Sequence, residues 1–149
     1  MRLRSRLHVL ALALLLGLLT GGLLSGTSGC VRAAQTYTLV PQGAPSSTVG
    51  SLSVERIEGG QRLVVLQFDG LPPPERIAPG MREFVVWLEG PQGKKVKVGT
   101  LRYDRDHRSG NLLATTDLRA FTVRVTGERD ARASEPSGVL LAERRVVTN

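Results

Sequence analysis

The feature that most constrains this chain is a period-two alternation of apolar and polar residues, which recurs in short segments from residue 51 onward. In 121–127, for example, Phe121, Val123 and Val125 alternate with polar residues. Such alternation indicates a β-strand with one buried face. Turn-forming residues recur about every 8 to 12 residues, which is the spacing typical of a sandwich. Because residues 30–149 show no amphipathic helix of ordinary length, we predict an all-β fold.

We expect about seven short strands arranged as an immunoglobulin-like antiparallel β-sandwich. The strand segments are 51–57, 62–70, 84–88, a return strand that includes Val96 and Val98, 112–116, 121–127 and 139–146, with 36–40 as a first edge strand. Segments 62–70 and 84–88 are apolar on both faces, which favours central positions. For a protein-binding module we expect an exposed apolar patch or a free strand edge, for which segment 51–57 is the candidate.

The segments between these strands carry their own signals. Gly59 and Gly60 accept positive φ, so they predict a tight hairpin. Four prolines exclude 71–81 from a central strand and make it a long crossing connection. The charged stretch 102–111 is expected to be a loop. In the return strand, Val96 and Val98 are expected to point inward.

The first 29 residues are organised like an export signal. Three arginines within the first six residues precede the apolar run 7–19, and small residues follow it. This order predicts a helical signal peptide over residues 1–29. The apolar run alone is shorter than the roughly 20 residues of a membrane span, but an extension through residue 24 would reach that length. A retained N-terminal anchor is therefore the alternative.

Cys30 is the only cysteine, so no internal disulfide can form. It directly follows Thr27, Ser28 and Gly29, and small residues before a cysteine just past an apolar run resemble the lipobox of bacterial lipoproteins. The resemblance implies that the signal is cut before Cys30 and that this cysteine receives diacylglycerol. Two acyl chains are enough for stable membrane anchoring. The alternative is ordinary signal cleavage nearby, which would leave a free thiol.

Charge limits the kinds of partner. Without the signal peptide the chain carries 17 Lys and Arg against 13 Asp and Glu, so it is mildly basic. A nucleic-acid-binding domain presents a dense basic stripe, and we expect no nucleic acid as a partner. Eight arginines are interspersed with acids, which favours a mixed solvated surface over a patch facing anionic lipid or wall polymer. They are Arg102, Arg105, Arg108, Arg119, Arg129, Arg132, Arg144 and Arg145.

Trp87 is the only tryptophan and lies within the apolar segment 84–88. Because its neighbours are apolar on both faces, we interpret it as a core residue that anchors the sandwich. Its indole N–H then needs a partner, which we expect to be a loop carbonyl. The alternative interpretation is an aromatic platform for sugar or peptide.

No catalytic, cofactor or metal site is predicted. Beyond the signal peptide the chain has one histidine, His107, flanked by Asp104, Asp106 and two arginines. A Ser-His-Asp triad needs three groups within hydrogen-bond reach, and a zinc site needs several His or Cys ligands. A solvated surface loop is therefore the preferred interpretation. Calcium held by the two aspartates is the alternative, which the interleaved arginines disfavour.

Three blocks carry a resemblance to a known family. They are VVLQFDGLPPP at 64–74, FVVWLEGPQGKKVKVGTL at 84–101 and FTVRVTGERDARASEPSGVLLA at 121–142. Together they resemble the extracytoplasmic C-terminal domain of bacterial anti-sigma-K factors. The resemblance implies a β-sandwich outside the cytoplasm. Few residues precede the apolar run, which leaves no room for the sigma-binding domain of that family, so sigma inhibition by this polypeptide is not expected.

These inferences divide the chain into three parts: a signal peptide over 1–29, a lipid-proximal tether with a first edge strand over 30–48, and an anti-sigma-K-like sandwich over 49–149. We predict a lipoprotein outside the cytoplasm, anchored to the bacterial cell membrane. It is expected to be a binding, sensing or structural module of the cell envelope, with an envelope protein as partner, no cofactor and no enzymatic activity. The alternative is a secreted or anchored glycan- or peptide-binding protein unrelated to sigma-factor signalling.

Overall fold

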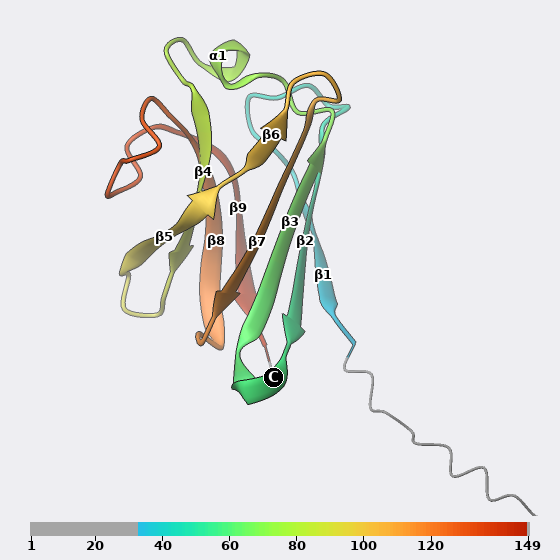
Figure 1. Cartoon of the computed structure of the whole chain (residues 1–149), viewed down its shortest axis with the longest axis vertical. Helices are drawn as coiled ribbons and strands as arrows, with labels where there is room; N and C mark the ends of the chain where they lie inside the picture. Colours follow the sequence, from blue (N-terminus) through green and yellow to red (C-terminus); the bar gives the residue numbers. More distant parts are fainter. Residues whose placement is uncertain (1–32, 149) are drawn as a thin grey trace, which may run out of the picture. The chain divides into compact units, whose positions relative to one another are not determined.

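The computed structural model describes residues 33–148, which form nine strands in two antiparallel sheets (Figure 1). The predicted signal peptide and Cys30 lie outside the described residues. The strands are β1 (Gln35–Leu39), β2 (Val49–Arg56), β3 (Arg62–Asp69), β4 (Glu83–Glu89), β5 (Lys95–Thr100), β6 (Arg102–Asp104), β7 (Ser109–Thr116), β8 (Ala120–Glu128) and β9 (Val139–Val147). A single helical turn, α1 (Pro74–Ile77), and a 3-10 turn, Glu58–Gly60, complete the elements.

The strand order confirms the predicted sandwich. Sheet A has the order β1-β2-β3-β7-β6, and sheet B has the order β5-β4-β8-β9. Apart from the additional strand β1, these orders correspond to the ABED and C′CFG sheets of immunoglobulin-like domains, with β4 in the place of strand C and β8 in the place of strand F. Every pair of neighbouring strands is antiparallel.

The hydrophobic core lies between the sheets because the strands of both sheets send alternate side chains inward. From sheet A, β3 contributes Val64, Leu66 and Phe68, all at most 1% exposed. Sheet B contributes alternate residues of β4 and β8, and in β9 it contributes two consecutive residues, Leu141 and Ala142, beside the register shift of the β8–β9 pair. These core residues of sheet B are Phe84, Val86, Leu88, Phe121, Val123, Val125, Leu141, Ala142 and Val146. The central positions expected for segments 62–70 and 84–88 are confirmed, because neither β3 nor β4 is an edge strand.

Two connections match their sequence signals. Gly59 and Gly60 have φ of 76° and 84° in the β2–β3 turn, a backbone conformation that glycine adopts without steric cost. The proline-rich segment 71–81 crosses from sheet A to sheet B and includes α1. Its first residue is fixed by the hydroxyl of Tyr103, which donates to the carbonyl of Leu71 at 2.9 Å.

Two expectations about strands and edges are wrong, and a third holds only in part. Segment 102–111 is a hairpin, in which β6 pairs with the start of β7, and its charged residues hid the alternation of a short edge strand. β2 offers no free edge, since β1 pairs with it from Gly50 to Val54. Val96 pairs with the core residue Leu88 and therefore lies on the inward face, but it is 48% exposed because β5 is an edge strand, of which Val98 packs against the core.

β5 is also irregular. Its register with β4 shifts between Val86 and Trp87, so that Gly99 pairs with Val86 whereas Lys97 pairs with Trp87. Such a bulge bends an edge strand and increases its twist. Two lysines, Lys95 and Lys97, project from this edge, and both are exposed.

The beginning and the end of the sandwich lie at the same end of it (Figure 1). Gln35 pairs with Val54 near the end of β2. At that end Arg62, the first residue of β3, donates from Nε to the hydroxyl of Thr148 at 2.9 Å. The first edge strand expected at 36–40 is therefore present at Gln35–Leu39, five residues after Cys30. No helix within residues 33–148 is long and apolar enough to cross a membrane.

Candidate functional site on the outer face of sheet B

The turn between β6 and β7 holds the histidine and the two aspartates singled out in the sequence. Asp104 Oδ1 accepts hydrogen bonds from the backbone N–H groups of Asp106 at 2.9 Å and His107 at 3.1 Å. Its Oδ2 lies 2.8 Å from His107 Nδ1. The backbone and side-chain hydrogen bonds of His107 hold the pKa of Asp104 below its ordinary value. The carboxylate thus caps an exposed turn, a usual role of aspartate.

Metal ligands do not converge in the described part of the chain. Within residues 33–148 no group of three or more His, Cys, Asp or Glu side chains could hold a metal ion. Within this range, the two aspartates of the β6–β7 turn therefore have too few neighbouring ligands to form a metal site.

The eight arginines named above are spread over several elements. They lie on β6 and its turn, in the β7–β8 connection, in the β8–β9 connection and on β9. Four have partners. Arg105 Nη1 donates to Glu75 Oε1 at 2.6 Å, and Arg108 Nη2 donates to the carbonyl of Gly70 at 3.1 Å. Arg132 Nε lies 3.5 Å from Asp130 Oδ1, and the guanidinium of Arg144 lies 5.1 Å from the centre of the Tyr37 ring. This distribution matches a mixed solvated surface better than a single basic patch.

Trp87 is fully buried, but on the outer face of sheet B. Its neighbours Val86 and Leu88 belong to the core between the sheets, and alternation turns Trp87 to the opposite face. Its side chain is 0% exposed, so the predicted burial is confirmed. The predicted loop carbonyl is wrong, because the indole Nε1 donates to the hydroxyl of Thr126 on the neighbouring strand β8 at 2.8 Å.

The connection between β8 and β9, residues 129–138, lies over this face of sheet B, and we call it the strap. One side of the strap is fixed to β5, where Lys97 Nζ donates to the carbonyl of Ala131 at 2.6 Å. On the other side it returns to β8 so closely that a Cβ on Gly138 would lie 1.8 Å from the carbonyl oxygen of Gly127. The strap therefore crosses β4 at Trp87, and only glycine fits where it rejoins the sheet.

A buried carboxylate fastens the strap. Glu128 is 1% exposed, and its Oε1 accepts hydrogen bonds from the hydroxyl of Thr126 at 2.7 Å and the backbone N–H of Ser137 at 3.1 Å. Its Oε2 accepts from the Ser137 hydroxyl at 2.8 Å. Burial acts to raise the pKa of Glu128, but the hydrogen bonds from Thr126, Ser137 and Gly138 outweigh it and lower the pKa below its ordinary value.

We expect acid to weaken the fold through Glu128. Because its folded-state pKa is lowered, its contribution to stability is complete above the ordinary value of 4.5 and is lost as the pH falls through the folded-state pKa. Urea unfolding at a series of pH values between about 3 and 7 measures this loss as a fall in the free energy of unfolding.

Glu128→Gln is the matched control for the acid effect, since an amide does not titrate. The free energy of unfolding of this variant should fall less steeply below about pH 4.5 than that of the unchanged chain. Asp104 and Asp130 also have lowered pKa values but are exposed, so they contribute to the remaining slope in both proteins. Equal slopes in the two proteins would contradict a fastening role for the carboxylate.

Beyond the strap, the outer face of sheet B is open and polar. A row of four side chains crosses its strands in register: Lys95 on β5, Glu89 on β4, Thr122 on β8 and Arg145 on β9. We call it the polar row. Glu89, Thr122 and Arg145 each stand next to a core residue along their strand, so their side chains project from the opposite, outer face.

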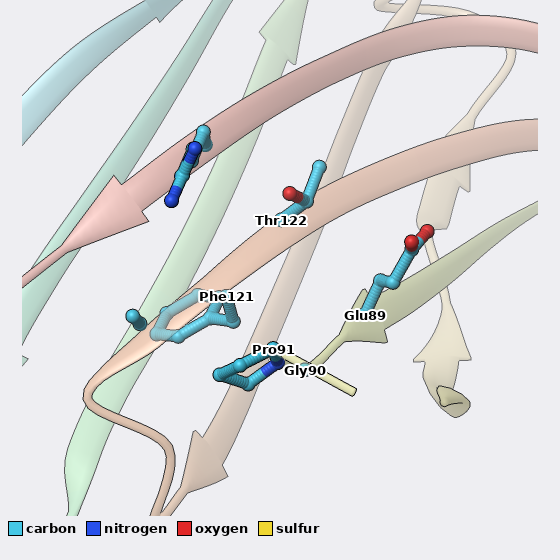
Figure 2. A pocket seen from close by; sticks show the side chains of 7 residues that line it. Glu89, Gly90, Pro91, Phe121 and Thr122 are labelled. Carbon is cyan, nitrogen blue, oxygen red and sulfur yellow. The ribbon is translucent and has the colours of Figure 1, made fainter. Parts of the chain in front are cut away.

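Three members of the polar row line a cavity of about 280 Å³, which we call the row cavity. Figure 2 shows Glu89 and Thr122 at its rim, with Pro91 and Phe121 beside them. Gly90, Ala120 and Arg145 complete its lining. The cavity therefore combines a carboxylate, a hydroxyl and a guanidinium with the apolar ring of a proline.

The hydrogen-bonding capacity of the row cavity is largely unused by the described residues. Glu89 Oε2 is buried and lies 3.5 Å from Arg124 Nη2 and 3.8 Å from Lys95 Nζ, yet it accepts no hydrogen bond from residues 33–148. Arg124 is shared, because its Nη2 also lies 3.0 Å from Glu143 Oε2. A buried polar atom without a partner calls for an explanation in terms of a ligand or solvent.

Sequence reasoning did not select Glu89 or Thr122, and it named Arg145 only among eight arginines. The alternation in 84–88 and 121–127 indicates which residues face away from the core. It does not indicate which strands are neighbours, and the row exists only because β4, β8 and β9 pair in this register. The sequence could thus predict that each of these residues faces outward, but not that they lie close together.

Comparison with known proteins gives no relative from which a function could be transferred: no family model, no curated protein and no solved structure matches this chain. The resemblance to the anti-sigma-K domain remains a prediction made from the residues. The functional argument therefore depends on the geometry of the sandwich and of its outer face.

Proposed function

We propose that this protein is a non-catalytic binding module of the bacterial cell envelope, anchored to the membrane by diacylglycerol on Cys30 and folded as an anti-sigma-factor-like sandwich. The observation that carries the proposal is the position of β1, which is already paired with β2 at Gln35, five residues after Cys30. Five extended residues span at most about 17 Å. A lipid on Cys30 would thus hold a preformed sandwich close to the membrane surface.

The same constraint gives the domain a preferred direction. The end that contains Gln35 also contains the β2–β3 turn, the β7–β8 connection and Thr148 (Figure 1). This end would face the lipid, and the β6–β7 turn and α1 at the other end would face away from it. A rigid sandwich on a short link presents its surfaces to envelope partners in a restricted range of orientations.

Cys30→Ser should release the protein from membranes, because it removes the site of both acyl chains, which together give stable anchoring. The measurement is the share of the protein in the membrane fraction, combined with the mass of the N-terminal peptide, which reports the diacylglycerol directly. Thr27→Leu is the control: leucine is usual at that position of a lipobox, so membrane retention should persist. Unchanged retention of Cys30→Ser would instead support an N-terminal span.

A second candidate function is glycan or peptide binding unrelated to sigma-factor signalling. The observation in its favour is the row cavity, where Glu89, Thr122 and Arg145 offer hydrogen-bond acceptors and donors side by side. The two candidates are compatible, since tethering concerns the N-terminus and ligand binding concerns the outer face of sheet B.

A further inference from the structure

We propose that the row cavity binds a saccharide that carries a carboxylate, such as a uronic-acid sugar. This inference rests on the second candidate function and names its ligand class. Neighbouring strands lie about 4.8 Å apart, so Glu89, Thr122 and Arg145 on three adjacent strands cover a width of roughly 10 Å. One or two sugar rings fit that width, and the 280 Å³ cavity provides a hollow for them.

The three polar groups match the chemistry of a sugar. Sugar hydroxyls both donate and accept, so one ring can serve the carboxylate of Glu89 and the hydroxyl of Thr122 together. Glu89 Oε2 accepts no hydrogen bond from residues 33–148. That oxygen is enclosed and lies near Arg124 and Lys95, so a ligand hydroxyl would donate to Oε1 of the same carboxylate instead. Pro91 supplies an apolar wall against which the carbon face of a ring can pack.

Charge favours an acidic sugar over a neutral one. Four cationic side chains, Lys95, Lys97, Arg124 and Arg145, and two anionic ones, Glu89 and Glu143, occupy two adjacent rows of this face. Arg124 is held between the two glutamates at 3.5 and 3.0 Å. Arg145 forms no ion pair with any residue in 33–148, so its planar guanidinium is free to take a carboxylate in a two-point contact.

The position of the cavity favours a saccharide over an extended peptide. A peptide that joins a sheet pairs through its backbone with an exposed strand edge. The row cavity instead lies on the face of sheet B, where the backbone of β4 and β8 is already paired on both sides. Recognition there depends on side chains alone, and a ring rich in hydroxyls offers them more partners than a peptide backbone.

The test is a titration of the full chain, kept in detergent micelles, with digalacturonate and separately with its methyl ester. NMR spectra of the ¹⁵N-labelled protein report binding at the amide of Thr122. We expect saturable binding of digalacturonate and binding about tenfold weaker for the ester, which lacks the charge that Arg145 would pair with. Arg145→Gln should weaken digalacturonate binding to a similar extent, about tenfold.

Two further variants locate the effect. Thr122→Val keeps the shape of the side chain and removes its hydroxyl, so it should weaken binding of both sugars. Arg102→Gln makes the same change as Arg145→Gln at an exposed arginine on β6 of sheet A, and it should leave binding unchanged. Arg102 and Arg145 are both exposed. An unchanged pattern of the remaining amide signals confirms that each variant folds.

Several outcomes would overturn the proposal: no saturable binding of digalacturonate, equal binding of acid and ester, full binding by Arg145→Gln, or displacement of the sugar by a tri-glutamate peptide that binds more tightly. None of them bears on the anchor, because the membrane fractionation of Cys30→Ser involves no ligand. Failure of the anchor with intact sugar binding would likewise leave this inference standing.

Discussion

Trp87→Ala will lower the free energy of unfolding by about 3–5 kcal/mol, the usual cost of removing a buried large aromatic side chain. The indole is 0% exposed between sheet B and the strap, so its removal leaves a cavity that the strap can fill only by moving. The variant also loses the hydrogen bond from Nε1 to Thr126. Urea unfolding followed by circular dichroism measures the loss without depending on the tryptophan itself.

Two comparisons make the Trp87 result interpretable. Trp87→Phe keeps an aromatic ring but not the indole N–H, so it should cost less than Trp87→Ala. Leu113→Ala removes a side chain that is 69% exposed on sheet A, and its effect should be within about 0.5 kcal/mol of zero. A near-neutral Trp87→Ala would mean that the ring is accessible, and it would revive the interpretation of Trp87 as a ligand platform.

Glu128→Ala will cost about 3 kcal/mol, since it removes a buried carboxylate that accepts three hydrogen bonds, and a hydrogen bond to a charged group contributes about 1.5–3 kcal/mol. The variant leaves the backbone N–H of Ser137, the Ser137 hydroxyl and the Thr126 hydroxyl without their shared acceptor. The strap then loses its fastening to β8 and should expose Trp87. A red shift of the tryptophan emission and stronger quenching by acrylamide report that exposure, and urea unfolding gives the energy.

Glu135→Ala is the matched control for the strap. Glu135 is exposed within the strap and forms no ion pair with any other residue in 33–148. Its removal should therefore change neither the emission of Trp87 nor the free energy of unfolding. If Glu128→Ala leaves both quantities unchanged as well, the strap is held by contacts other than the carboxylate.

The architecture was predictable from local patterns because half-buried strands record their two faces in alternate residues. Segments 62–70 and 84–88 were correctly expected at central positions, and the glycines at 59 and 60 correctly marked a hairpin. β6 was missed because three residues are too few to establish an alternation among charged neighbours. The free edge expected for 51–57 was wrong because the sequence indicated a first edge strand at 36–40 but not that this strand pairs with β2.

The candidate site was much less predictable than the fold. The burial of Trp87 followed from its apolar neighbours, but not its position outside the core, because 84–88 is apolar on both faces. The strap, which is tied to β5 and β8 on this face, has small and polar residues that are typical of an exposed loop. Glu128 was not recognised as buried, because the hydrogen bonds that stabilise its carboxylate come from residues such as Ser137, whose proximity the sequence does not indicate. The polar row likewise depends on pairing between distant strands.

The irregular edge at β5 has a consequence for crowding. Under the anchoring proposed above, copies held to one surface by short links would meet repeatedly in two dimensions, and a long flat edge would let their sheets pair into a continuous array. The register shift beside Trp87 bends this border, and Lys95 and Lys97 repel an identical border that approaches it. We therefore expect the protein to stay dispersed at high surface density, and its neighbours to remain individually accessible.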